Sequence, residues 1–285
     1  MRGCLLCLSL VVAAVAHADE KDEMAVKQKA TALTVLKRLD IVKPAVVETP
    51  DLIVTGNLPE DRLKALAEPV QKQFATVMKA LKFEMTDNPP KGKVAVYFLT
   101  ERKLYSAFVS DVLKEQIERD ERAHVSAVGI EPFIVVSVLP GEKPTDLDVE
   151  ALNQVAIVLL QAKAGVARLP YWMEEGFARA VKWRTTPAVG TAERAKAKLL
   201  LTGKGKFKAA DAWLATTDKD RPLVAAALMD YLTYGPGSAN LGKLLAGFRV
   251  PEDEKAPGID AVLMGVDLTP EKLDAALKKW LLTGK

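Results

Sequence analysis

Cysteine and histidine are scarce in this chain of 285 residues, which contains two of each. Cys4, Cys7 and His17 lie close to the N-terminus, so His124 is the only one of the four beyond residue 17. A catalytic zinc ion takes three protein ligands, most often histidine or cysteine. The rest of the chain therefore lacks the residues for a zinc–thiolate site, an iron–sulfur cluster, a cysteine nucleophile or any mechanism that needs two histidines.

The first 18 residues follow the order of a secretory signal peptide. Arg2 supplies a positive charge, an uncharged and mostly apolar run extends from Cys4 to Ala16, and residues 16–18 have the small-x-small pattern that signal peptidases recognise. This run is too short to span a bilayer. A buried N-terminal helix is the alternative, but acidic residues follow directly from Asp19. We therefore expect cleavage after Ala18 and export to the periplasm or the outside of the cell, as a mature protein without cysteine.

Charge is nearly balanced, with 40 lysines and arginines against 37 aspartates and glutamates. The two signs are mixed along the chain, and no basic stripe with interleaved aromatic residues indicates a nucleic-acid partner. No later apolar segment is long enough for a transmembrane helix. A chain of this length is able to bury a sizeable core without disulfides, so we expect an exported globular protein.

Hydrophobic periodicity predicts strands mixed with helices in the first half of the chain. The continuous apolar run from Val94 to Leu99 is the best candidate for a central strand. Thr100 is expected to cap a following helix, which then continues as an exposed helix from Lys114 to Arg122. The other predicted elements are a loose helix from Met24 to Leu39, extended segments at 46–47 and 52–54, a long helix over 59–81 and a strand pair at 125–128 and 133–139.

Beyond residue 140 the pattern is almost wholly helical. One helix is expected to begin at Thr145, with Asp148 in the spacing of a capping box, and another near Trp172. After Pro187 the pattern predicts helices alone, with connections at 235–237 and 251–258. Strands mixed with helices and then helices alone indicate an α+β fold with a helical C-terminal part. The expected organisation is a signal peptide (1–18), an N-terminal arm (19–45), an α+β domain (46–186) and a helical subdomain (187–285).

One segment carries a recognisable motif. This segment is Leu169-Pro170-Tyr171-Trp172-Met173-Glu174-Glu175-Gly176-Phe177-Ala178. It resembles the leucine-proline-x-tryptophan-leucine-x-glutamate-glycine-leucine-alanine signature of peptidase MA-like proteins. The resemblance covers roughly residues 45 to 282. It implies a zincin-like fold, in which a small mixed β-sheet packs on an active-site helix. In that family the preceding helix carries H-E-x-x-H, whose histidines bind zinc and whose glutamate activates water, and the glutamate before the glycine completes the metal site.

The chain departs from the family at the positions that carry the chemistry. The resemblance places Asn153 and Ile157 at the two histidines, Gln154 at the general base and Glu175 at the third ligand. Isoleucine has no donor atom, and the neutral carbonyl of asparagine is a poor zinc ligand. A glutamine amide is not a useful base at neutral pH. We therefore expect no catalytic residues, no metal and no cofactor at the degenerate positions.

A pair of carboxylates, as in glycoside hydrolases, is a second possible kind of site. Glu174 and Glu175 are adjacent on a helix and diverge by about 100°, so they cannot flank one bond. Asp148 or Glu150 would have to partner Glu175, and nothing in the sequence selects either. Glu174 is expected to be solvated. Glu175 is either a residue of an inherited cleft or a carboxylate that favours the start of its helix. His124 is expected to be a surface or strand-edge residue.

The sequence therefore predicts a catalytically inactive, metallopeptidase-like protein with a binding or scaffolding role toward a protein, peptide or envelope ligand. The alternatives are a hydrolase that uses Glu175 with an unidentified acid, and a purely structural envelope protein. Five residues are candidates for lining the cleft: Asn153, Gln154, Glu175, Tyr171 and Trp172. We expect residues 146–163 to form one helix with Asn153 and Ile157 on one face, and Glu175 to approach that face from the next helix.

Overall fold

A computed structural model describes residues 5–83, 92–127, 131–139, 141–143, 146–165, 167–203, 207–214, 218–249, 254 and 256–283, with side chains from Asp22 onward except that of Asp146. The chain divides into two compact units, one of residues 1–72 and 85–151 and the other of residues 73–84 and 152–285. The helices α2 (Glu60–Ala80) and α4 (Asp146–Ala164) contribute residues to both units. Each unit is described by itself.

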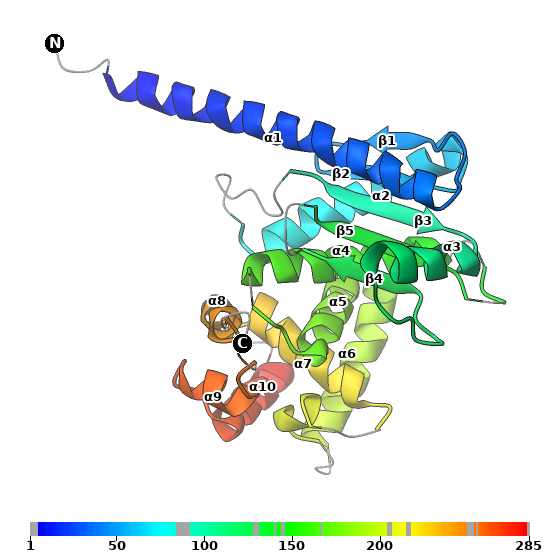
Figure 1. Ribbon diagram of the computed structural model, residues 1–285. Coiled ribbons are helices and arrows are strands. Elements are labelled where there is room, and N and C mark those ends of the chain that lie inside the picture. Colours follow the sequence, from blue (N-terminus) through cyan, green and yellow to red (C-terminus); the bar gives the residue numbers. More distant parts are fainter. Residues whose placement is uncertain are drawn as a thin grey trace. The chain divides into compact units, whose positions relative to one another are not determined.

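The first unit contains a small mixed β-sheet of five strands in the order β1-β2-β3-β5-β4 (Figure 1). β2, β3 and β5 are parallel to one another, and the edge strands β1 and β4 are antiparallel to their neighbours. The bounds are Val46–Glu48 for β1, Leu52–Gly56 for β2, Val94–Leu99 for β3, Ala123–Ser126 for β4 and Phe133–Ser137 for β5.

The predicted central strand is confirmed, because β3 lies in the middle of the sheet and all six of its residues are buried. Successive side chains of a strand point to opposite faces of the sheet. Ala95, Tyr97 and Leu99 belong to the hydrophobic cluster on one face, while Val94 and Val96 are buried on the other. A strand covered on both faces reads as a continuous apolar run, which is the pattern seen in the sequence.

The N-terminal helix α1 (Leu5–Arg38) supplies part of the core of the first unit. Its side chains are described from Asp22, so those of the expected signal peptide, Cys4 and Cys7 included, lie outside the described part. From there on, the buried positions recur at helical spacing: Ala25, Gln28, Ala32, Val35 and Leu36. Ala32, Val35 and Leu36 join the same cluster as Ala95 and Tyr97. The predicted helix over 24–39 is therefore present, and its apolar row packs on the sheet.

The expected cap at Thr100 is wrong. α3 (Arg102–Ala107) begins two residues later, and Glu101 occupies the N-cap position without a side-chain capping bond. Thr100 is instead hydrogen-bonded to Asn57, the residue that follows β2. Its backbone N–H donates to Oδ1 of Asn57 at 2.8 Å, and Nδ2 of Asn57 donates to its hydroxyl oxygen at 2.9 Å. The hydroxyl is therefore engaged across the sheet instead of at the helix start.

The exposed helix expected from Lys114 to Arg122 is also wrong. α3 continues as a single π-helical segment, η1 (Phe108–Leu113), and the chain then leaves the helix at Lys114 with a φ of 63°. The guanidinium of Arg102 donates to the backbone carbonyls of Glu118, at 2.9 Å, and of Glu121. The carbonyl of Glu118 also accepts the N–H of Glu121 at 3.3 Å, so this segment forms a turn that the side chain of Arg102 holds, and not a helix.

The predicted strand pair after this segment is confirmed as β4 and β5, although β4 begins earlier than expected and includes His124. Residues 128–130 lie outside the described residues, and so does Thr145, the expected start of a capping box. Asp148, its other member, accepts a 3.0 Å bond from Nη2 of Arg62.

The second unit is helical, as predicted for the C-terminal part. It contains the end of α4 followed by α5 (Tyr171–Thr185), α6 (Pro187–Thr202), the short 3₁₀-helix η2 (Ala209–Ala212), α7 (Arg221–Tyr234), α8 (Ser238–Gly247), α9 (Ile259–Met264) and α10 (Pro270–Thr283). Helix α7 is buried from Leu223 to Thr233 and forms the centre of this unit. The predicted turn at 235–237 separates α7 from α8, and the expected α+β class is confirmed for the described chain.

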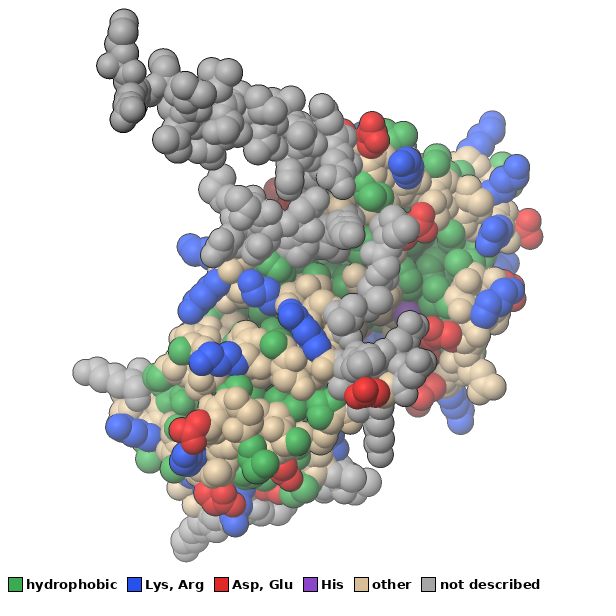
Figure 2. All heavy atoms as spheres, turned by 60° about the vertical axis from the view of Figure 1, so that its left-hand side comes forward, with side chains coloured by type: hydrophobic (Ala, Val, Ile, Leu, Met, Phe, Trp, Pro, Cys, Tyr) green, Lys and Arg blue, Asp and Glu red, His purple; other side chains and the backbone are tan. Residues whose placement is uncertain are grey.

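Surface charge agrees with the balanced composition. On the face drawn in Figure 2, acidic and basic side chains are interspersed with apolar ones. Within the ranges described, the helices are all too short or too polar to cross a bilayer.

Candidate functional site

The motif segment lies on α4 and α5, and α4 supplies a half-buried polar row. This helix is continuous from residue 146 to 164, so Asn153, Ile157 and Gln161 follow one another at single-turn spacing on one face. All three are half-buried, as is Gln154 on the adjoining face. The row therefore presents two amides and one aliphatic side chain, and Asn153 and Ile157 are the two positions that the sequence resemblance aligned with histidines.

Helix α5 begins at Tyr171, directly after Pro170, as the motif predicts. The carbonyl oxygen of Pro170 accepts the N–H of Met173 at 2.9 Å. Trp172 is buried, and its ring packs against that of Trp213 with the centroids 5.7 Å apart. Tyr171 is 70% exposed. Of these two aromatic candidates, Trp172 is thus a core residue of the second unit and Tyr171 a surface residue.

The carboxylate that reaches the row on α4 belongs to Glu174. Its Oε1 accepts a 2.8 Å hydrogen bond from Nε2 of Gln161. Burial raises the pKa of Glu174 above its usual value, and the bond from Gln161 opposes that rise in part. The expectation that Glu174 is solvated is therefore wrong. The half-buried side chain is held against α4, one turn beyond Ile157.

Glu175 is half-buried as well. Residues adjacent on a helix diverge by about 100°, so Glu175 cannot share the direction of Glu174. Within the described residues its carboxylate forms no hydrogen bond or ion pair. The pKa of Arg179, one turn along α5, is raised first by a hydrogen bond to Glu193 and further by the charge of Glu175. The electrostatic partner of Glu175 is therefore on its own helix.

Gly176 has a packing role that the sequence did not reveal. A Cβ at this position would lie 2.7 Å from the carbonyl oxygen of Ala225 and 3.1 Å from Cγ of Met229, both on α7. No real Cβ approaches a backbone oxygen so closely, so only glycine allows α5 and α7 to pack at this distance. Helix packing therefore explains the glycine in the glutamate-glycine pair of the motif.

Two ionic clusters fix α5 against its neighbours. Arg179 donates to both carboxylate oxygens of Glu193 on α6, at 2.8 and 3.1 Å, and Nε1 of Trp183 donates to the same carboxylate at 2.6 Å. Arg184 donates to both oxygens of Asp230 on α7, at 2.7 and 2.9 Å.

Asp230 is the centre of the second cluster and is only 1% exposed. Nε of Arg194, on α6, lies 3.4 Å from the same carboxylate, so two arginines surround one buried aspartate. Sequence reasoning missed this residue. The signal that would have found it is a single acidic side chain within the apolar segment from Leu223 to Leu232, since a buried carboxylate needs partners.

The acids considered as partners of Glu175 belong to the first unit and are already paired. Asp148 binds Arg62, and the buried Glu150 lies 3.0 Å from Nε of Arg122. His124, in β4, lies 3.5 Å from carboxylate oxygens of both Glu115 and Glu121. Its ring stacks on Phe133 with the centroids 6.1 Å apart. His124 is thus a strand-edge residue, as expected.

The donor set of the motif does not fit a zinc ion. Asn153 and Gln154 offer neutral amide oxygens, Ile157 offers none, and the nearby carboxylate of Glu174 is bonded to an amide. Zinc prefers thiolate, imidazole and carboxylate ligands. Throughout the part of the chain that the structure describes, no group of three or more histidine, cysteine, aspartate or glutamate side chains is placed to hold a metal ion.

No protein-family model matches the sequence, and no curated protein sequence is similar enough to count as a relative. The resemblance to peptidase MA-like proteins therefore depends on the residues of the motif and on the order of the elements around it.

Proposed function

We propose that the chain is an exported, non-catalytic relative of the peptidase MA-like, zincin-fold proteins, and that it acts by binding a protein, peptide or envelope ligand. The motif on α5, the small mixed sheet and the helical C-terminal part support the relationship. The apolar run that precedes Ala16-His17-Ala18 supports export.

The observation that carries the proposal is the contact between Gln161 and Glu174. In a hydrolytic site of this family, the face of the first helix would direct imidazoles and a carboxylate toward a metal ion. Here the same row contains Asn153, Ile157 and Gln161, and the carboxylate from the second helix is bonded to the amide of Gln161 at 2.8 Å. The face is thus occupied by a polar contact between helices, without a base or a ligand set.

The hydrolase alternative requires a second acid beside Glu175. Asp148 and Glu150, the acids considered for it, each form an ion pair with an arginine. The charge of Glu175 acts on Arg179, one turn along the same helix. Neither of the two acids considered is thus free to serve as the second acid beside Glu175.

The proposal is tested by measuring metal in the purified protein. We expect elemental analysis of the wild type to find no stoichiometric zinc and a panel of peptides to remain uncleaved. One zinc ion per chain, or peptide cleavage that a chelator abolishes, would overturn the proposal.

The zincin relationship has a separate test, in which the family's residues are restored by the changes Asn153→His, Gln154→Glu and Ile157→His. If the relationship holds, the triple variant binds zinc, and the further change Glu175→Ala removes it. Glu174→Ala is the matched control, because it removes the adjacent carboxylate. If Glu174→Ala removed zinc and Glu175→Ala did not, Glu174 would be the ligand instead of Glu175. The motif would then not align with that of the family, and the proposed relationship would be wrong.

A further inference from the structure

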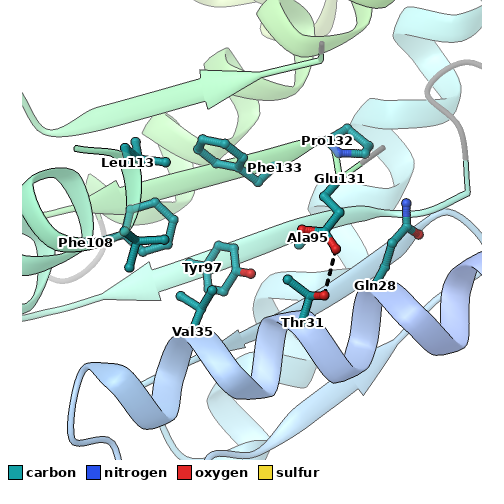
Figure 3. A pocket seen from close by; sticks show the side chains of 11 residues that line it. Gln28, Thr31, Val35, Ala95, Tyr97, Phe108, Leu113, Glu131, Pro132 and Phe133 are labelled. Atoms are coloured by element: carbon teal, nitrogen blue, oxygen red, sulfur yellow. Dashed lines mark hydrogen bonds between the residues drawn. The ribbon is translucent and has the colours of Figure 1, made fainter. Parts of the chain in front are cut away.

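The first unit contains a cavity of about 150 Å³ between α1, one face of the sheet and η1 (Figure 3). Ala95, Tyr97 and Leu99 point to this face of β3, and Ala95 and Tyr97 line the cavity. None of the residues that line it belongs to the motif on α4 and α5.

One side of the cavity is aromatic. The rings of Tyr97 and Phe108 lie 5.0 Å apart at 55°, and those of Phe108 and Phe133 lie 5.7 Å apart at 59°. Val35 of α1 and Val112 of η1 complete the apolar wall. Tilted rings at these separations pack favourably, so the wall is rigid. A cavity of about 150 Å³ with apolar walls has room for a molecule the size of benzene.

The opposite side is polar and carries a negative charge. Oε1 of Glu131 accepts a 2.6 Å hydrogen bond from the hydroxyl of Thr31, which leaves the second carboxylate oxygen to another donor. No lysine or arginine among the described residues forms an ion pair with Glu131. Glu131 is an exposed residue at the edge of the cavity, and within the described chain no cation is paired with its negative charge.

Tyr97 adds a third polar group at the same place. Figure 3 shows its hydroxyl directed toward the side on which Thr31 and Glu131 lie. The side chain is 4% exposed, and its hydroxyl forms no hydrogen bond with a described residue. Buried hydroxyl groups are nearly always hydrogen-bonded, to protein, water or ligand. Tyr97 lines the cavity, so its hydroxyl is available to a hydrogen-bond partner that enters there.

We propose that this cavity binds a small primary amine with a compact apolar body of about six to eight heavy atoms. The ammonium group donates to the free oxygen of Glu131 and to the hydroxyl of Tyr97, and the apolar body lies against the rings of Phe108 and Phe133. An ammonium beside aromatic faces gains cation–π attraction as well as the ionic bond. A carboxylic acid of the same size would meet the charge of Glu131 and be repelled. The inference rests on the first unit alone and does not depend on the function proposed above.

The test is calorimetric titration of the purified full-length protein with benzylamine, and separately with benzyl alcohol and benzoate, which share its ring. We expect benzylamine to bind at least about tenfold more tightly than benzyl alcohol, and benzoate not to bind, because only the cation pairs with the carboxylate. The change Glu131→Gln should weaken benzylamine by about tenfold and leave benzyl alcohol unchanged.

Two further variants keep the result interpretable. Glu60→Gln is the matched control, because Glu60 is an exposed glutamate that pairs with Lys64 on α2 and does not line the cavity. It should leave all three titrations as they are. Val112→Phe places additional atoms in the cavity and should abolish binding of both benzylamine and benzyl alcohol. Circular dichroism confirms that each variant is folded.

The proposal is overturned if benzylamine does not bind at millimolar concentration, or if benzyl alcohol or benzoate binds as tightly. It is equally overturned if a folded Glu131→Gln protein binds benzylamine as the wild type does. If Glu60→Gln weakens benzylamine as much as Glu131→Gln does, the amine recognises surface charge and not the cavity.

Discussion

The side-chain amide of Gln161 on α4 donates a 2.8 Å hydrogen bond to the carboxylate of Glu174 on α5. This contact joins the two helices of the motif through one neutral side chain, Gln161, and one acidic side chain, Glu174. Burial raises the pKa of the Glu174 carboxyl. Within the motif it is thus the carboxylate of Glu174 that contacts a side chain of α4.

The first prediction concerns the pH dependence of that contact. A carboxyl group whose folded-state pKa lies above its unfolded value destabilises the folded state when ionised, and this cost disappears as pH falls toward the unfolded pKa. Glu174→Gln should therefore raise the free energy of unfolding at pH 7 by on the order of 1 kcal/mol, because a neutral amide is cheaper to bury. The gain should shrink as pH is lowered toward 4. Urea unfolding of wild type and variant at both pH values measures it, and a lower stability of the variant at pH 7 would contradict it.

The second prediction concerns the glycine of the motif. Gly176→Ala should destabilise the protein by about 1–3 kcal/mol, since its Cβ would collide with the carbonyl oxygen of Ala225 and force α5 away from α7. Gly242 on α8 is the matched control, because a Cβ there meets no atom within 4 Å. Gly242→Ala should stabilise the protein by up to about 1 kcal/mol through helix propensity. Thermal unfolding of the two variants should thus show shifts of opposite sign.

The third prediction concerns the buried aspartate of α7. Asp230→Ala leaves the guanidinium groups of Arg184 and Arg194 without their shared carboxylate, and should cost about 3–5 kcal/mol. Asp267→Asn removes the charge that pairs with Lys272 in an exposed ion pair and keeps a residue that tolerates the φ of 54° at this position, so it should change stability by less than about 0.5 kcal/mol. Equilibrium unfolding in urea compares the two. If the two variants lost the same free energy of unfolding, the ion pairs of Asp230 with Arg184 and Arg194 would not contribute to stability as proposed.

The fourth prediction concerns Glu193. The pKa of this carboxyl is lowered, first by the hydrogen bond from Arg179 and also by the one from Trp183, against the opposing effect of burial. A lowered folded-state pKa contributes stability that is present above the unfolded value and is lost as pH falls through the folded value. Glu193→Gln should therefore destabilise at pH 7 by about 1 kcal/mol, because the carboxylate is partly open to solvent. The difference from wild type should shrink as the pH falls below the unfolded value and through the lowered folded-state pKa. A difference that stays constant in acid would argue against the charge as its cause.

Several elements were predictable from the sequence because one local signal determined them. The run from Val94 to Leu99 has no polar interruption, and it forms the buried central strand. The breakers at 235–237 end α7 where expected. The course of residues 114–122 was not predictable, because the bonds from Arg102 to the carbonyls of Glu118 and Glu121 depend on a side chain far along the chain.

The candidate site was predictable in composition but not in geometry. The motif located α4 and α5 and identified Asn153, Gln154 and Ile157 as unsuited to zinc. Which of two adjacent glutamates faces α4 depends on the rotation of α5 about its axis. That rotation is determined by contacts with α7, such as the one at Gly176, which no local pattern contains. The cavity in the first unit was not predictable either, because its lining comes from α1, β3, η1 and the start of β5, which are far apart in the sequence.

The place of α1 in the hydrophobic cluster determines the order in which the first unit is able to fold. Ala32 and Leu36 are synthesised early, but the cluster also needs Tyr97, about 60 residues later, and Val135, about a hundred residues later. At synthesis rates of about 5–20 residues per second, the apolar face of α1 waits about 5–20 s for its last partner. During that interval this face lacks the side chains that cover it in the folded unit, and a chaperone that binds apolar segments would meet it uncovered.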